Sequence, residues 1–311
     1  MNPRTPRRRL LSLAAVAVLA GLLTVGCSKD SSDTSSTKAG PGTATGTIRI
    51  GSQKFSESRT LAEVYAQYLK AKGFRVSVEA PIADRTQLLA AMVKGTVDLE
   101  LDYTGSAVTE LGGKAEADPE KTFATLQKLL EPKGLVATTQ SPAANANALV
   151  ALTSWADENK VTKISDLARL DGPLTLGGAP ECAERLDCLA GYNGPTYRLG
   201  LKFTPVAYGP ALVAALEANE IDVAQYGSTA PELAGGTIRI LEDDKGLQSA
   251  QNVVPVLRKK VVTAKLTEAL DALSAQITTK DLSAWNLATD GKAKEDPADV
   301  AQAWLEKNGL I

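Results

Sequence analysis

From residue 47 onwards, apolar positions follow two periods along the chain. Short segments such as Ile48–Gly51 and Phe74–Val78 have the length and β-branched content of strands. Between them, apolar residues recur every three or four positions from Leu61 to Leu69, which is typical of an amphipathic helix, and Gly73 is a stop signal for that helix. This order of strand, helix, strand, helix and strand predicts an α/β fold with a mainly parallel sheet and covering helices.

One part of this pattern occurs twice. Residues Leu89–Leu99 and Val213–Val223 match at a constant offset of 124 positions. Each copy predicts a short amphipathic helix that ends at Gly95 or Asn219, residue types that tolerate the left-handed conformation, and then a strand and a polar turn with a tyrosine. Ligands bind at the carboxyl ends of strands in open α/β sheets, so the repeat indicates two lobes that present their strand ends to a shared cleft. The alternative is a chance similarity between two common helix-strand units.

The amino-terminal segment has the composition of an export signal. Basic residues precede an apolar run from Leu10 to Val25, and small residues follow, which predicts a signal peptide over residues 1–27. The alternative is an uncleaved membrane anchor, for which the apolar run is short. Arg7–Leu11 also resembles a twin-arginine signal, so the export route stays open. Residues 28–46 are polar and small, and we expect them to form a flexible tether.

The end of this segment resembles a known processing site. The sequence Leu23-Thr24-Val25-Gly26-Cys27 is similar to the lipobox of bacterial lipoproteins. That resemblance implies that Cys27 is lipidated and becomes the first residue. The protein would then be lipid-anchored to the cell membrane on its extracytoplasmic face.

Composition argues against several classes of function. The formal net charge is −2, and basic patches interleaved with aromatic residues are absent, so we expect no nucleic-acid partner. The chain has no histidine, no glycine-rich phosphate loop and no Gly-x-Ser-x-Gly motif, so we expect no enzyme, no cofactor and no metal. Asp98 and Asp222 occupy equivalent positions of the repeat, which is a better explanation for them than a catalytic pair.

Two of the three cysteines lie close together. Cys182 and Cys188 stand in a polar, proline-flanked segment, and in an exported protein such a pair indicates a structural disulfide. A metal site requires more ligands than this segment offers. A catalytic thiol requires a base, and the chain contains no histidine.

A set of short segments is spread in order along almost the whole exported part: Ile48–Ser52 with Phe55 and Glu57, Ala90–Gly105, Ala148–Ala151, Ile164–Leu167, Gly200–Phe203, Leu241–Lys245, Asn252–Arg258 and Asp296–Gly309. Together these segments resemble the substrate-binding proteins of ABC importers for glycine betaine, choline and carnitine. The resemblance implies a type II periplasmic-binding-protein fold, in which two lobes joined by two hinge crossings close on the ligand. We expect lobe 1 to comprise residues 47–146 and 259–311, and lobe 2 to comprise residues 147–258.

In this family a box of aromatic rings holds the quaternary ammonium group by cation–π attraction. Carried over position by position, the resemblance and the predicted strand ends give a set of candidate ligand-binding residues. They are Lys54, Phe55, Asp102, Tyr103, Thr104, Asn145, Tyr226, Ser228, Thr229 and Asn252. Arg85, at the start of the first repeat helix, either pairs with an anionic group or is solvated. Phe55 either contributes a ring or packs in a core, and Tyr208 or Tyr197 would supply further rings.

The predicted box has fewer rings than the family pattern. Asn147, Gln251, Asn252 and Gly227 stand where many members have aromatic residues. The leading hypothesis is a membrane-anchored receptor that captures a small quaternary ammonium or zwitterionic solute and delivers it to an ABC permease with its ATPase. The second keeps the receptor fold but assigns a more polar solute. A catalytic cleft and a structural or adhesive lipoprotein are the remaining alternatives, and the absent motifs and the ordered resemblance argue against them.

Overall fold

The computed structural model describes residues 46–311. The predicted signal peptide, Cys27 and all of the tether except Gly46 lie outside these residues. Within 46–311, no helix combines the length and the apolar character that crossing a bilayer requires.

Ten strands form two five-stranded sheets in the described part of the chain. The first has the order β2-β1-β3-β10-β4, with β1 (Ile48–Gly51), β2 (Val76–Val78), β3 (Leu99–Tyr103), β4 (Leu135–Ala137) and β10 (Val253–Arg258). The second has the order β7-β6-β8-β5-β9, with β5 (Asn147–Leu152), β6 (Thr175–Gly178), β7 (Lys202–Pro205), β8 (Val223–Gly227) and β9 (Ile238–Leu241). In each sheet three neighbouring strands are parallel, and one central strand, β10 or β5, runs antiparallel to its neighbours.

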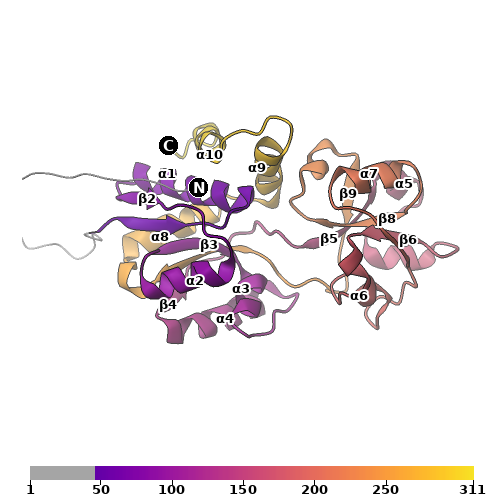
Figure 1. Cartoon of the computed structure of the whole chain (residues 1–311), viewed down its shortest axis with the longest axis horizontal. Coiled ribbons are helices and arrows are strands. Elements are labelled where there is room, and N and C mark those ends of the chain that lie inside the picture. Colours follow the sequence, from indigo (N-terminus) through magenta and orange to yellow (C-terminus); the bar gives the residue numbers. More distant parts are fainter. Residues whose placement is uncertain (1–45) are drawn as a thin grey trace, which may run out of the picture. The chain divides into compact units, whose positions relative to one another are not determined.

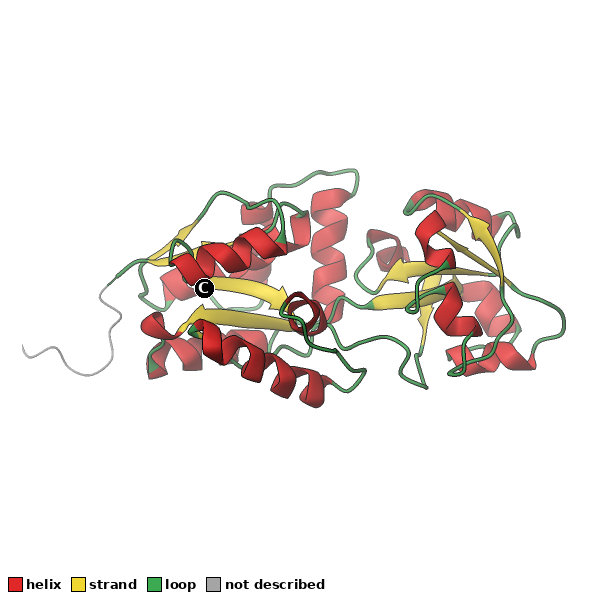
Figure 2. Cartoon of the chain, turned by 60° about the horizontal axis from the view of Figure 1, so that its bottom comes forward, coloured by secondary structure: helices red, strands yellow, loops and turns green. Residues whose placement is uncertain are grey.

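Helices cover the sheets, as the alternating order of apolar patterns predicts (Figures 1 and 2). The α-helices are α1 (Ser56–Ala71), α2 (Arg85–Lys94), α3 (Thr104–Glu110), α4 (Pro119–Leu130), α5 (Thr153–Glu158), α6 (Leu189–Asn193), α7 (Pro210–Glu217), α8 (Ala264–Ser274), α9 (Thr279–Asp290) and α10 (Pro297–Lys307). Short 3-10 helices are η1 (Glu131–Lys133), η2 (Ile164–Arg169), η3 (Pro180–Ala183), η4 (Pro231–Gly235) and η5 (Lys259–Val261).

Each sheet is buried on both faces. One face of the first sheet packs against α1, α8, α9 and α10, and the other packs against α2, α3 and α4. One face of the second sheet packs against a cluster that contains Cys182 and Cys188, and the other packs against α7 and η4. The two cysteines form the predicted disulfide, with a Cα–Cα distance of 5.3 Å.

The two copies of the repeat have the same local geometry. Helix α2 ends at Gly95 with φ of 83°, and α7 is followed by Asn219 with φ of 55°, so both residues adopt the predicted left-handed conformation. Three residues after Gly95 and Asn219, each copy has an Asp that binds the neighbouring strand. The Asp98 carboxylate accepts the Arg49 N–H at 3.1 Å, and the Asp222 carboxylate accepts the Thr175 N–H at 2.7 Å. The match is therefore a structural repeat.

A glycine in each copy allows the repeat helix to approach the sheet closely. A Cβ atom on Gly51 would lie 2.6 Å from Leu88 and 2.9 Å from Val97. A Cβ atom on Gly177 would meet Leu212 and Ile221, which are the equivalents of those two residues. The absence of a side chain at both glycines thus lets the same helix-strand contact form twice.

The segments that connect the two sheets lie beside each other. Ala144 and Asn252 form an antiparallel bridge, and the Asn145 N–H donates to the Gln251 carbonyl at 3.1 Å. The chain returns earlier than expected, because β10 pairs with β3 and β4 in the first sheet. The expected boundary of lobe 2 at residue 258 is therefore wrong, because β10 belongs to the sheet of lobe 1. The apolar sequence of β10 fits the interior of either sheet.

The polar turns that the repeat predicts at Asp102–Ser106 and Gln225–Thr229 are also corrected. In the first copy, Thr104 begins helix α3 directly after β3. In the second copy, β8 continues through Tyr226 to Gly227, so Tyr226 belongs to a strand and not to a turn. The two strands nevertheless end at equivalent positions, Tyr103 and Gly227.

Candidate functional site

Tyr103, the last residue of β3, points into the protein and meets a buried carboxylate. Its hydroxyl donates to Glu57 Oε1 at 2.5 Å, and the two side chains are 5% and 3% exposed. Burial, followed by the charge of Glu57, holds the pKa of Tyr103 well above its usual value. Tyr103 is therefore a neutral hydrogen-bond donor to the Glu57 carboxylate.

Two amides complete the environment of Glu57. Asn145 Nδ2 donates to Oε1 at 2.9 Å, and Asn286 Nδ2 donates to Oε2 at 2.6 Å. Asn286 Nδ2 also donates to the Thr229 carbonyl at 2.9 Å. Because both partners of this nitrogen are acceptors, the orientation of the Asn286 amide is determined by its chemistry. Asn145 thus links Glu57 to the first segment that connects the two sheets. Asn286 on α9 links Glu57 to Thr229, which follows the strand of the second repeat copy.

The end of β8 reaches the same place. A Cβ atom on Gly227 would lie 3.4 Å from both Asn145 Oδ1 and the Tyr208 hydroxyl oxygen. The Gly227 N–H donates to that hydroxyl at 3.3 Å. Asn145 therefore lies next to Gly227 and is hydrogen-bonded to Glu57, which also accepts from Tyr103. The ends of β3 and β8 thus both lie close to Asn145.

Aromatic rings with exposed faces lie on both sides of this cluster. Phe55, just before α1, is 43% exposed and stacks on Tyr103 with ring centroids 6.4 Å apart. Tyr208, just before α7, is 59% exposed and lies 5.2 Å from Tyr226 by the same measure. Desolvation of the Tyr208 hydroxyl raises its pKa, although the hydrogen bond from Gly227 opposes this.

Asp102 does not share this site, although we expected it to face the same cleft as Tyr103. Successive residues of a strand point to opposite faces, and Asp102 lies on the α2 side of β3. Its carboxylate accepts from Arg85 Nε at 2.9 and 3.1 Å. Arg85 is therefore paired, and the solvated alternative for it is wrong.

A second carboxylate is buried beside this ion pair. Glu100 is 2% exposed, and its Oε2 has no hydrogen-bond partner among the described residues. Burial, together with the neighbouring charge of Asp102, raises the pKa of Glu100 well above its usual value. Burial also raises the pKa of Asp102, although the Arg85 charge opposes it.

Two other candidate tyrosines are core residues. Tyr226 is 1% exposed, packs against α7 and donates from its hydroxyl to the Gly209 carbonyl. Tyr197 is buried and donates to Asp243 Oδ1 at 2.6 Å. Tyr226 therefore offers no exposed ring, because strand alternation places its side chain on the face of the sheet that α7 covers.

Most of the predicted polar residues hold the crossing segments. Thr104 Oγ1 donates to the Ala250 carbonyl at 3.2 Å and accepts the Asn252 N–H at 3.1 Å. Asn252 Nδ2 donates to the Ser141 carbonyl at 2.9 Å. These contacts tie the start of α3 to the second crossing segment and leave little of Thr104 or Asn252 free.

Ser228, Thr229 and Lys54 differ in their surroundings. Ser228 Oγ donates to the Ala144 carbonyl at 3.0 Å, while Thr229 is buried and presents its carbonyl to Asn286. Lys54 is exposed and makes no hydrogen bond or ion pair with residues 46–311. Of the three, only Lys54 has a polar group that is free to meet a solute.

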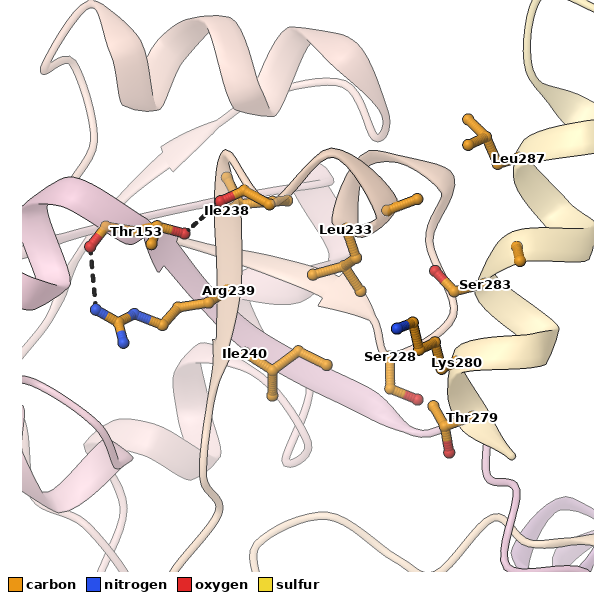
Figure 3. Close-up of a pocket in the computed structure, with 13 residues that line it drawn as sticks. Thr153, Ser228, Leu233, Ile238, Arg239, Ile240, Thr279, Lys280, Ser283 and Leu287 are labelled. Atoms are coloured by element: carbon orange, nitrogen blue, oxygen red, sulfur yellow. Dashed lines mark hydrogen bonds between the residues drawn. The ribbon is translucent and has the colours of Figure 1, made fainter. Parts of the chain in front are cut away.

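Two cavities share Ser228 in their lining, and the first of them also adjoins the crossing segments. One has a volume of about 450 Å³, and its polar lining includes Asn147, Ser228, Gln251 and Asn252. The other, of about 690 Å³, lies between α9 and the η4–β9 region and is shown in Figure 3. Its lining is largely aliphatic, with Leu233, Ile238, Ile240 and Leu287, and includes no aromatic ring. Neither cavity contains the ring set of Phe55, Tyr103 and Tyr208.

The sequence analysis missed the roles of Glu57 and Asn286. Glu57 belongs to a segment that carries the family resemblance, but nothing in its neighbours indicates a buried carboxylate. Asn286 lies 229 residues from Glu57 and sits in an ordinary amphipathic helix. Only the packing of α9 against the η4 region brings it to the site.

Comparison with known proteins identifies the family. A model described as the substrate binding domain of the ABC-type glycine betaine transport system matches residues 46–307. The carnitine transport binding protein OpuCC of Listeria monocytogenes is 28% identical over 282 residues, which cover 87% of this chain and 89% of that protein. The glycine-betaine-binding protein of Pseudomonas aeruginosa is 28% identical over 282 residues, which cover 85% and 89%.

Solved structures confirm the two-lobe type II fold. A crystal structure of a glycine betaine/carnitine/choline ABC transporter protein superposes with a TM-score of 0.77 at 23% identity, covering 85% of this chain and 99% of that one. Apo YehZ from Escherichia coli gives a TM-score of 0.73 at 22% identity, with the same coverage. The relatives are transport proteins and not enzymes. With its fold and nearly all of its described length matched, the chain belongs to the family of substrate-binding domains of ABC-type glycine betaine transport systems.

Proposed function

We propose that this protein captures glycine betaine, choline or a related quaternary ammonium osmolyte in the cleft between its lobes and delivers it to an ABC permease. The observation that carries the proposal is the pair of exposed rings that adjoin the Glu57 cluster: Phe55 stacks on Tyr103, and the Tyr208 hydroxyl meets Gly227 beside Asn145. The relatives named for carnitine and glycine betaine support the same ligand class.

The chemistry of the ligand matches these rings. A quaternary ammonium group spreads its positive charge over methyl groups and has no N–H to donate, so aromatic faces attract it by cation–π interaction. Phe55 precedes α1 and Tyr103 ends β3, and both elements belong to lobe 1. Tyr208 precedes α7, which belongs to lobe 2. A ligand that contacts rings from both lobes binds the closed state better than the open one and thereby drives closure.

A more polar solute is the weaker proposal. The polar residues that replace rings of the family pattern are engaged within the protein: Asn147 Nδ2 donates to Asp187 at 2.7 Å, and Gln251 Oε1 accepts from Ser106. Side chains that already have partners contribute little to the recognition of a polyol. The exposed rings therefore favour the quaternary ammonium ligand.

We propose that the protein acts at the extracytoplasmic face of the cell membrane, anchored by a lipid on Cys27. The lipobox-like sequence supports this, although Cys27 lies outside the described residues. Metabolic labelling with palmitate tests the proposal: the wild-type chain is expected to incorporate label, and incorporation that persists in Cys27→Ser would disprove it.

Calorimetric titration of the full chain in detergent tests the ligand. The panel is glycine betaine, choline, carnitine, proline betaine and ectoine. We expect at least one methylated amine to bind, and Phe55→Ala and Tyr103→Ala to weaken its affinity about tenfold or more. Phe55→Ala removes an exposed cation–π partner, and Tyr103→Ala removes the ring on which Phe55 stacks. Leu287→Ala is the control, since Leu287 is a similarly exposed apolar residue on α9 that belongs to no ring set. A folded protein that binds none of the panel would contradict the proposal.

A further inference from the structure

Glu57 is a buried carboxylate without a cationic partner. It is 3% exposed, and none of the ion pairs among residues 46–311 includes it. Two other buried carboxylates of lobe 1, Asp102 and Asp98, are paired with arginine at 2.7 to 2.9 Å, whereas Glu100 lies beside Asp102 without an ion pair of its own. Glu57 therefore differs from Asp102 and Asp98 in the one feature that normally compensates a buried charge.

The groups around Glu57 orient its carboxylate but carry no charge. Tyr103, Asn145 and Asn286 donate hydrogen bonds at 2.5, 2.9 and 2.6 Å. Glu57 also lies in the first turn of α1, where the helix dipole favours a negative group. These contacts fix the position of the carboxylate without supplying a positive charge.

The Asn286 amide has a further vacant acceptor. Its Nδ2 is used twice, by Glu57 and the Thr229 carbonyl, while its buried Oδ1 has no hydrogen-bond partner among the described residues. Asn286 is 7% exposed. The cluster thus combines a net negative charge with an unused acceptor, and both disfavour an anionic occupant nearby.

Building on the function proposed above, we propose that the Glu57 carboxylate is the counter-charge for the ammonium pole of the ligand. Phe55 stacks on Tyr103, and the Tyr103 hydroxyl bonds to Glu57. Asn145, which also bonds to Glu57, lies beside Gly227, whose N–H donates to the Tyr208 hydroxyl. A cation held between these rings lies close to the carboxylate in a partly desolvated site, where opposite charges attract strongly. In this protein, Glu57 compensates for the rings that are missing from the family pattern.

The alternative is a purely structural role, in which Glu57 only positions Tyr103 and Asn145. The two roles predict different responses to ligand charge. A positioning residue affects every ligand of the same shape equally, whereas a counter-charge affects only the cation. Replacing the quaternary nitrogen by carbon gives the required pair: choline with 3,3-dimethylbutan-1-ol, and glycine betaine with 3,3-dimethylbutanoate.

The experiment measures both members of a pair by calorimetry with the full chain. In wild type we expect the ammonium ligand to bind better than its carbon isostere. Glu57→Gln keeps the size of the side chain and removes the charge, so the affinity ratio of the pair is expected to fall at least about tenfold. Glu63→Gln makes the same charge change on α1, where Glu63 borders a different pocket with Arg59, and is expected to leave the ratio unchanged.

A second variant covers the case in which Glu57→Gln does not fold. Glu57→Asp keeps the charge but withdraws it by one methylene, so a selective loss of affinity for the ammonium ligand supports the proposal. An equal loss for ligand and isostere, in either folded variant, overturns it and leaves the proposed function standing. Failure of wild type to bind any quaternary ammonium ligand would instead overturn the proposed function, and this inference with it.

Discussion

The two copies of the repeat make the same contact with different chemistry. In lobe 1, Asp102 on β3 reaches Arg85 at the start of α2 and forms an ion pair at 2.9 Å. Tyr226 and Gly209 occupy the equivalent positions in lobe 2, where the tyrosine hydroxyl donates to the glycine carbonyl. In both copies a strand residue is thus fastened to the start of the repeat helix.

The difference extends to the neighbouring positions. Glu100 in β3 corresponds to Ala224 in β8, and Tyr103 corresponds to Gly227. Lobe 1 therefore has a buried carboxyl group within its strand and an aromatic ring at the strand end. Lobe 2 has an alanine and a glycine at the corresponding positions. A shared backbone frame leaves each lobe free to supply a different part of the site.

The largest effect is expected from removing the arginine of lobe 1. Arg85→Leu leaves Asp102 buried without its partner, and we expect the free energy of unfolding at pH 7 to fall by about 3 kcal/mol. Burial raises the pKa of Asp102 even in wild type, so the loss should shrink as the pH is lowered and the carboxyl becomes protonated. Chemical denaturation of the full chain at pH 7 and at acid pH measures both.

The matched control acts at the equivalent contact of lobe 2. Tyr226→Phe removes only a neutral hydrogen bond, and a loss of about 1 kcal/mol is expected, with little dependence on acid pH. Equal losses in the two variants would show that the Arg85 charge contributes no more than a neutral bond.

An effect of opposite sign is expected at Glu100. The folded protein raises the pKa of this carboxyl above its ordinary value of 4.5, so the stability that it contributes is complete below that value and is lost as the pH rises. Glu100→Gln removes the ionisation, and the variant should be more stable than wild type at pH 7 by about 1.4 kcal/mol for each unit by which the pKa is raised. Denaturation at pH 4 and pH 7 checks this, and a variant that is less stable than wild type at pH 7 would refute it.

The smallest effect concerns the open end of β8. A ring at position 227 would restore the aromatic residue of the family pattern, and the space there admits a Cβ atom at 3.4 Å from its nearest neighbours. Gly227→Phe is expected to tighten glycine betaine binding about threefold, through one added cation–π contact at a partly exposed position. Gly227→Leu adds apolar bulk without a π-system. If calorimetry showed the same gain in glycine betaine affinity for both variants, the gain would come from apolar contact and not from the aromatic ring.

Much of the fold could be predicted from the sequence because its signals are local. Apolar periodicity predicted the strands and helices of lobe 1, and Gly95 and Asn219 adopt the left-handed conformation that their residue types allow. The predictions failed where two arrangements share one local pattern. The apolar run of β10 suits either sheet, and the residues after Ile221 suit either a turn or a longer strand, so pairing partners decided both.

The candidate site was less predictable. Tyr103, Phe55 and Asn145 gather around one carboxylate, whereas Asp102 and Tyr226 turn away because a strand alternates its faces and the sequence alone did not give its register. Glu57 and Asn286 were not anticipated as partners, since no local pattern records a contact over 229 residues.

The sequence by itself determined the family, the repeat and the disulfide, because collinear segments, a fixed offset and a close cysteine pair are properties of order along the chain. Only the tertiary structure decided which side chains meet. Strand register sends Asp102 to Arg85 and Tyr103 to Glu57, and the packing of α9 brings Asn286 to the same carboxylate. A buried charge without a cationic partner is visible only after every neighbour is in place, since compensation depends on distance in space and not on position in the sequence.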